Sequence, residues 1–126
     1  MKYVMKLITK ELERAFETQP IYSQDGKGLN AKALAKFFFG NATWYVLEAE
    51  REDNDWIFFG LVRIGDEIEY GYFSMSELEE ATTRDGVCFL ERDLYFDIGT
   101  LVKDLDDKSV VEFVGRVYDE EVAGDK

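Results

Sequence analysis

The chain has 126 residues, which suits one globular domain spanning residues 1–126 and leaves no room for a second independent core. With 46% hydrophobic and 15% aromatic residues it is too apolar to be intrinsically disordered, although its net charge is -12. The absence of histidine excludes imidazole-based catalytic triads and zinc sites, and the single cysteine, Cys88, cannot form an internal disulfide.

The first predicted element is a short amphipathic helix at residues 10–17. Thr9 precedes it as a candidate N-cap, and apolar residues from Ile8 to Phe16 recur at helical spacing. Residues 18–28 contain proline, glycine and small polar side chains, which predicts a loop.

Four strands are expected next, because stretches rich in aromatic and β-branched residues alternate with short polar breaks. The predicted strands span residues 33–39, 43–50, 56–64 and 67–73. Short breaks indicate hairpins, so the strands should form an antiparallel meander.

A two-residue turn at Gly65-Asp66 would fix the register of the last hairpin. The face that carries Phe59 and Leu61 is then expected to meet the core. On the opposite face two glycines oppose each other, which favours close approach of a helix, with a partner's backbone as the alternative. The predicted pairs are Ile64 with Glu67, Leu61 with Tyr70, Phe59 with Tyr72, Val62 with Glu69, and Gly60 with Gly71.

Ser74 and Glu77 have the spacing of a capping box, which predicts a helix from Met75 to about Thr82. A turn at 83–86 and a short strand at 87–90 should follow, with Cys88 as a small buried residue of that strand.

Two more helices are predicted near the C-terminus. Residues 98–105 form the first. The second begins at Ser109, where Ser109 and Glu112 repeat the capping-box spacing, although the many valines of this stretch also suit a strand. The expected fold class is therefore α+β: an antiparallel meander sheet of four to five strands with three to four short helices packed on it.

Glu91, Arg92 and Asp93 form the one cluster that suggests catalysis. In a strand Glu91 and Asp93 share a face, as a carboxylate pair for acid and base chemistry would require. The simpler interpretation is that Arg92 makes a fixed ion pair or binds a carbonyl. Asp104, Asp106 and Asp107 resemble the start of a calcium loop, but the required glycine and final glutamate are missing, so no metal or other cofactor is expected.

Several segments read together resemble one family. They are Lys36-Phe37-Phe38, Trp44-Tyr45, Trp56 to Val62, Glu69 to Leu78 and Leu90 to Phe96. Over about residues 5–97 the chain is similar to the domain-of-unknown-function family numbered 2958, and residues from about 104 to 126 form an acidic extension. Tyr95 departs from the family pattern, because many members are expected to have histidine there. The resemblance implies a small α+β protein of plasmids, phages and other mobile elements, with no assigned activity and sometimes with neighbouring genes that counter restriction.

The charge distribution suggests a partner class. Residues 1–63 carry nine Lys or Arg and nine Asp or Glu, whereas residues 64–126 carry six and eighteen. This asymmetry favours a basic protein partner and disfavours direct binding to nucleic acid or to an anionic membrane. Lysines interrupt the apolar N-terminus and no apolar run is long enough to span a bilayer, so a cytoplasmic location is expected.

Our leading hypothesis is a non-enzymatic interaction module that docks on a basic surface, such as that of a nuclease or DNA-binding protein. Its sharper form is a DNA mimic of the anti-restriction or anti-CRISPR type. The alternatives are a carboxylate-based enzyme using Glu91 and Asp93 beside Arg92, and a soluble domain with no specific ligand. The residues expected to form the acidic face are Asp66, Glu67, Glu69, Glu77, Glu79, Glu80, Asp104, Asp106 and Asp107.

Overall fold

The computed structural model of the chain describes residues 6–124, and only the backbone for residues 119–124. In chain order the elements are α1 (Lys10–Thr18), η1 (Gly28–Asn30), β1 (Lys32–Ala33), β2 (Ala35–Phe39), β3 (Ala42–Glu52), β4 (Asp55–Ile64), β5 (Glu67–Ser74), α2 (Met75–Ala81), β6 (Thr83–Arg84), β7 (Val87–Cys88), β8 (Glu91–Arg92), β9 (Thr100–Leu101), η2 (Val102–Asp104) and α3 (Lys108–Gly124). Here η denotes a single 3-10 turn. No helix within the described range is long and apolar enough to cross a lipid bilayer.

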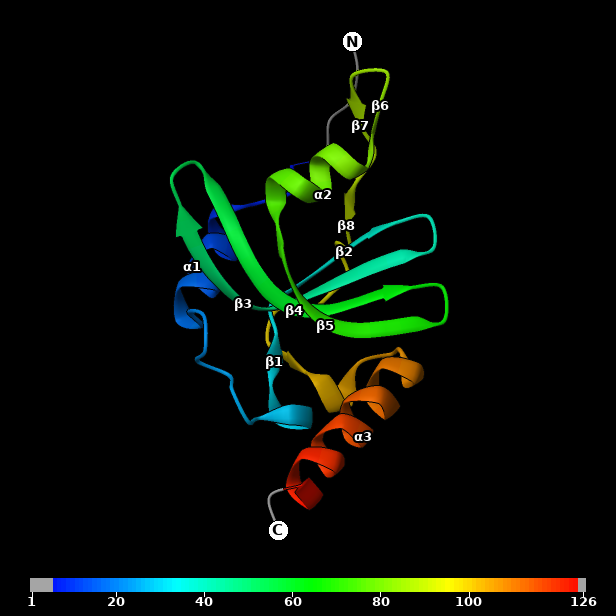
Figure 1. Cartoon of the computed structure of the whole chain (residues 1–126). Coiled ribbons are helices and arrows are strands. Elements are labelled where there is room, and N and C mark those ends of the chain that lie inside the picture. The colour runs from blue at the N-terminus through cyan, green and yellow to red at the C-terminus, as the bar shows by residue number, and fades with distance from the viewer. Residues whose placement is uncertain (1–5, 125–126) are drawn as a thin grey trace.

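A five-stranded antiparallel sheet in the order β5-β4-β3-β2-β8 forms the centre of the fold (Figure 1). Strands β2 to β5 are consecutive in the chain, so the predicted meander and the α+β fold class are confirmed. The short strand β8 adds to the edge of β2, and two-residue ladders pair β1 with β9 and β6 with β7.

The β4–β5 hairpin has the predicted register, and all five predicted pairs form. Gly65 has a φ of 59°, which suits a two-residue turn. The assignment of the core to one face was incomplete. Leu61 is fully buried, but Tyr72 on the same face is 58% exposed, whereas Phe58 and Phe73 of the opposite face are buried. Each face of the sheet therefore carries its own core.

No described helix packs against the opposed glycines Gly60 and Gly71, so the prediction of a close-packed helix there was wrong. A Cβ atom at Gly60 would overlap the carbonyl oxygen of Tyr45 and lie 3.2 Å from the amide nitrogen of Leu47, whereas one at Gly71 would meet nothing within 4 Å. The close approach comes from β3, whose pairing with β4 shifts by one residue at Leu47. Gly60 thus accommodates a β-bulge in the neighbouring strand.

The first core lies between one face of the sheet and helices α1 and α2. Phe16 of α1 is completely buried and meets the ring of Phe58 edge-on at 5.1 Å, while Met75 and Leu78 contribute from α2. Edge-to-face packing of two buried rings adds specific geometry to the burial of apolar area.

The second core lies on the opposite face and includes α3. Val110 and Val114 are completely buried together with Val102 of η2 and Leu61 of β4. The predicted acidic extension is therefore anchored to the sheet through the apolar side of α3 (Figure 1).

Two of the three predicted N-caps, Thr9 and Ser74, are confirmed. Thr9 Oγ1 accepts a hydrogen bond from the amide of Leu12 at 3.2 Å, at the start of α1. At the start of α2, Ser74 Oγ accepts from the amide of Glu77 at 3.2 Å and donates to Glu77 Oε1 at 2.9 Å. The bonds from the amides of Leu12 and Glu77 satisfy donors that a helix start leaves without an intrahelical partner.

The helix predicted at 98–105 was wrong. Gly99 has a φ of 90°, its amide donates to the carbonyl of Ala33, and Thr100–Leu101 pairs with β1 as β9. Only the turn η2 follows. The apolar residues of this segment do recur at helical spacing, but pairing with β1 overrides that local preference.

The helix expected after Ser109 is present as α3, but the second capping box is not. Asp107 Oδ1 accepts from the amide of Val110 at 3.3 Å, so Asp107 rather than Ser109 caps the helix. Cys88 lies on the predicted strand, as part of β7, but is half-buried rather than buried.

Candidate functional site

The nine carboxylates predicted to form one acidic face fall into three groups. The β4–β5 turn and β5 carry Asp66, Glu67 and Glu69; α2 carries Glu77, Glu79 and Glu80; the η2–α3 junction carries Asp104, Asp106 and Asp107. Along β5, five strand steps of roughly 3.3 Å separate Glu69 from Ser74, and seven separate Glu67 from it, so these two residues lie about 17 and 23 Å from the start of α2. The first and third groups meet at Arg63, because its Nη1 donates to Asp107 and its pKa is raised by Asp107 and also by the charge of Asp66. The structure therefore brings these two groups together, while α2 carries the second group beyond the far end of β5.

The group at the η2–α3 junction already has internal contacts. Asp107 accepts a hydrogen bond from Arg63 Nη1 as well as capping α3, and its side chain is 16% exposed. Among the residues whose side chains are described, no three Asp, Glu or Cys side chains are grouped closely enough to hold a metal ion.

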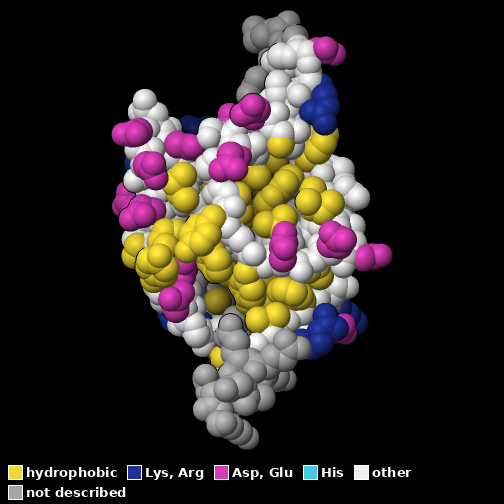
Figure 2. Space-filling model, in the orientation of Figure 1, with side chains coloured by type: hydrophobic (Ala, Val, Ile, Leu, Met, Phe, Trp, Pro, Cys, Tyr) yellow, Lys and Arg dark blue, Asp and Glu magenta, His cyan; other side chains and the backbone are white. Residues whose placement is uncertain are grey.

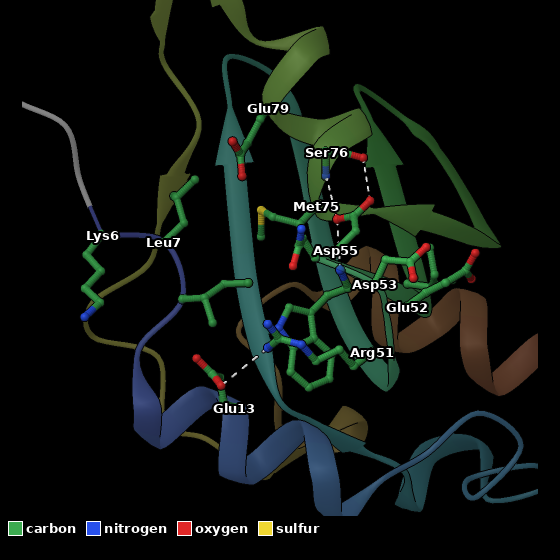
Figure 3. A pocket seen from close by; sticks show the side chains of 14 residues that line it. Lys6, Leu7, Glu13, Arg51, Glu52, Asp53, Asp55, Met75, Ser76 and Glu79 are labelled. Atoms are coloured by element: carbon green, nitrogen blue, oxygen red, sulfur yellow. Dashed lines mark hydrogen bonds and ion pairs between the residues drawn. The ribbon is translucent and has the colours of Figure 1, made fainter.

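A groove of about 790 Å³ lies where the β3–β4 turn meets α1, α2 and the segment before α1 (Figure 3). We call it the acidic groove. Its apolar floor consists of Leu7, Ile8, Trp56, Ile57 and Met75. Its carboxylates are Glu13, Glu52, Asp53, Asp55 and Glu79, against the cations Lys6 and Arg51.

Most of these carboxylates were missed by the sequence analysis. The acidic stretch 51–55 was interpreted only as the break between two strands. Of the predicted acidic face, Glu79 alone lines this groove. The sequence signal was the density of acidic residues at 52–55. The proximity of this turn to α2, however, depends on the length of the β3–β4 hairpin, which the sequence does not predict.

Asp55 joins the β3–β4 hairpin to α2. Its Oδ1 accepts from the amides of Trp56 at 2.8 Å and Ser76 at 3.1 Å, and its Oδ2 accepts from the hydroxyl of Ser76 at 2.5 Å. Desolvation raises the pKa of Asp55, but the hydrogen bonds from Ser76 and Trp56 outweigh it, so the pKa lies below its ordinary value. Asp55 therefore stays ionised while it positions the helix.

Glu79 faces the same groove from α2 (Figure 3). Partial desolvation, followed by the negative charge of Asp55, raises the pKa of Glu79 above its ordinary value. A nearby cation would reverse the second effect, because opposite charge favours the ionised carboxylate.

Arg51 shows which ligand chemistry the groove accommodates. Its guanidinium lies 5.5 Å from the ring centroid of Trp56, and its Nη1 is 3.7 Å from Glu13 Oε2. An aromatic face combined with a carboxylate is a favourable environment for a guanidinium. The groove thus already holds one guanidinium, supplied by the chain itself.

The cluster proposed as a carboxylate pair lines a different hollow, of about 450 Å³, beside β8. Asp93 Oδ2 lies 3.5 Å from Lys36 Nζ, and Asp93 Oδ1 accepts from the amide of Tyr95 at 2.9 Å. Arg92 Nη2 donates to the carbonyl of Lys6 at 3.4 Å. Glu91, Arg92 and Asp93 are therefore brought together, with Asp93 and Arg92 engaged in contacts that hold the fold.

Lys36 links this hollow to a neighbouring one of about 260 Å³ that Tyr45 also lines. Its ammonium lies 5.8 Å from the centre of the Tyr45 ring. Burial, followed by the charge of Asp107, raises the pKa of Tyr45 to about 12. Tyr45 is consequently neutral at physiological pH and serves as a packed ring rather than as a base.

The family described as protein of unknown function (DUF2958) matches residues 7–105. No curated protein and no solved structure matches the chain. The matched range contains the whole sheet, α1, α2 and the β3–β4 turn, and so most of the acidic groove. Because it covers most of the sequence, the chain belongs to the DUF2958 family.

Proposed function

We propose that this protein is a non-enzymatic binding module whose acidic groove docks a basic, partly apolar segment of another protein. The observation that carries the proposal is the composition of the groove: among the described residues, five carboxylates and two cations line it together with an apolar floor. Leu7, Ile8 and Ile57 of that floor are only partly buried, so they still offer apolar surface to a partner. Such a floor favours burial of apolar side chains, and the carboxylates favour lysine or arginine beside them.

The position of Arg51 supports this chemistry. Its guanidinium contacts Trp56 and Glu13, while Glu52, Asp53 and Glu79 are exposed residues that line the same groove. A basic group of the partner would add to an environment that already stabilises one guanidinium.

The net charge of -12 supports a partner of opposite charge. A field of this sign accelerates encounter with a basic surface and weakens as ionic strength rises. Under this proposal the partner is met in the cytoplasm.

The more specific form of the proposal is that the protein mimics DNA and binds a nuclease, including a restriction or CRISPR nuclease. Duplex DNA presents one negative charge per about 1.7 Å of axis, so a mimic needs closely spaced carboxylates. The β3–β4 turn together with α2 supports this form best, since it carries Glu52, Asp53, Asp55, Glu77, Glu79 and Glu80. Displacement of bound protein from such a nuclease by duplex DNA would distinguish this form from docking on other basic proteins.

The test uses isotope-labelled protein and a defined peptide in which two arginines flank a leucine, titrated by NMR at low and moderate salt. The groove variant combines Glu52→Gln, Asp53→Asn and Glu79→Gln. Asparagine suits position 53, where φ is 54°. The matched control removes the same charge from the β4–β5 group through Asp66→Asn, Glu67→Gln and Glu69→Gln.

We expect amide shifts around the groove, weaker binding at higher salt, and at least a tenfold loss of affinity in the groove variant with less than a twofold loss in the control. Equal losses in both variants would mean that total charge, rather than the groove, attracts the peptide. An analogue with citrulline in place of arginine should not bind, and its binding with equal affinity would refute the role of charge.

A further inference from the structure

Another hollow of about 260 Å³, distinct from the one beside Tyr45, lies between the loop before β1, the middle of the sheet and α3. Among the residues whose side chains are described, none lines both this hollow and the acidic groove. Tyr70 of β5 and Tyr118 of α3 are among the residues that line it. Figure 2 views the molecule from the side of β5, where hydrophobic side chains gather over β4 and β5.

The carboxylate of Glu48 lines this hollow although the side chain is almost completely enclosed, with 2% exposed. Its Oε1 accepts from the amide of Tyr22 at 2.9 Å and its Oε2 from the amide of Gln24 at 2.8 Å. No Lys or Arg described in the structure lies within 4.0 Å of it. Two amides occupy about half of the lone-pair positions of a carboxylate, so a positive group can still bind it.

A β-bulge directs Glu48 into this hollow. Strand β3 pairs Val46 with Gly60 but Glu48 with Phe59, because Leu47 is the extra residue. Without the bulge Glu48 would lie opposite Phe58, inside the first core. β-Bulges commonly re-aim side chains beside functional sites.

Aromatic rings line the same hollow. Phe59 and Tyr70 stack in parallel, with ring centroids 5.7 Å apart and planes within 3°, and Tyr118 lines the hollow from α3. Gly28 brings the loop against Tyr118, since a Cβ there would lie 2.9 Å from that ring. Aromatic rings combined with a carboxylate are the usual means of binding an organic cation.

We propose that this hollow binds an alkylammonium or guanidinium cation, with Glu48 as the charge partner and Phe59, Tyr70 and Tyr118 as the aromatic walls. Asp25, which is exposed and also lines the hollow, adds negative charge at its mouth. The proposal is independent of the acidic groove and of the partner proposed for it.

The test compares three probes by NMR titration of the full chain: n-butylamine, N-acetyl-lysine methylamide, and N-acetyl-norleucine methylamide as the neutral control. The first two should shift the amides of Gly26 and Phe59 and bind at least tenfold more tightly than the third. If the lysine derivative binds at least tenfold more tightly than n-butylamine, the natural ligand is a protein side chain; equal affinities indicate a free amine.

Two variants decide the assignment. Glu48→Gln keeps the shape but removes the charge, and Phe59→Leu keeps an apolar wall but removes a ring. Each should weaken binding of the lysine derivative at least fivefold, whereas Asp66→Asn and Tyr95→Leu, which alter residues outside the hollow, should change it less than twofold. If Glu48→Gln does not fold, Phe59→Leu alone decides.

The proposal is overturned if norleucine binds as tightly as lysine, if Asp66→Asn weakens binding as much as Glu48→Gln, or if the shifts map outside the hollow.

Discussion

Gln24 fixes the loop between α1 and β1 to the sheet, and its replacement by alanine measures how far the loop depends on one buried amide. The side chain is 5% exposed. Its Nε2 donates to the carbonyls of Lys32 at 2.7 Å and Leu47 at 2.6 Å, and its Oε1 accepts from the amide of Lys32 at 2.6 Å. Gln24 thus bridges β1 and the bulge of β3.

The expected magnitude follows from these three hydrogen bonds. Each contributes about 1 kcal/mol net, and a buried group left without its partner costs about 1–3 kcal/mol. Leu47 is 3% exposed, whereas Lys32 is exposed and its backbone is more readily hydrated. We therefore expect Gln24→Ala to lower the free energy of unfolding by about 2–4 kcal/mol. The matched control is Gln19→Ala, which removes one bond accepted from the hydroxyl of Ser23 and should cost less than about 1 kcal/mol.

Urea unfolding followed by tryptophan fluorescence compares the two variants, and hydrogen exchange reports on the loop. The backbone amide of residue 24, which donates to Glu48, should exchange with solvent faster in Gln24→Ala than in Gln19→Ala. Equal losses of stability in the two variants would refute the reasoning, because they would show that the buried amide contributes no more than a half-exposed one.

Three further outcomes are expected. Gly60→Ala should lower the melting temperature far more than Gly71→Ala, since a Cβ at Gly60 overlaps a backbone carbonyl and one at Gly71 meets open space; equal shifts would contradict the bulge geometry. Folding lowers the pKa of Asp55, so its contribution to stability is present above about pH 4 and is lost as pH falls through the folded-state pKa. Asp55→Asn should therefore weaken the fall of the melting temperature at acidic pH. Because the pKa of Tyr45 is raised to about 12, its contribution to folding stability is complete below about pH 10 and is lost as pH rises toward 12. The ultraviolet titration of Tyr45→Phe should lack the tyrosine ionisation step at the highest pH.

The sheet was predictable from sequence because its signals are local. Turn residues at 65–66 and alternating aromatic residues determined both the strands and the β4–β5 register. The caps at Thr9 and Ser74 were equally local. The segment 98–105 was mispredicted because its partner, β1, lies more than sixty residues earlier in the chain, and no local pattern reveals that pairing.

The acidic groove was not predictable for the same reason. It combines the β3–β4 turn with α1, α2 and the segment before α1, which lie far apart in the chain. Charge counting identified the second half of the chain as acidic, but Glu52, Asp53 and Asp55 belong to the first half, where the balance is zero. The charge distribution therefore suggested a class of partner, but it did not identify the surface that would bind it.

Glu48 explains why β3 contains a bulge. On an ideal strand Glu48 would share a face with Trp44 and Val46, which pack in or against the first core, and its charge would be buried among aromatic rings. The extra residue at Leu47 rotates the carboxylate to the opposite face, where two loop amides bind it and the aromatic hollow opens. The only sequence signal is one glutamate in the apolar stretch 44–49. It indicates that a charged side chain must be accommodated in a buried strand, but it does not indicate that a bulge accommodates it. Because strand faces alternate with a period of two, a single inserted residue decides whether this charge disrupts a core or lines a binding site.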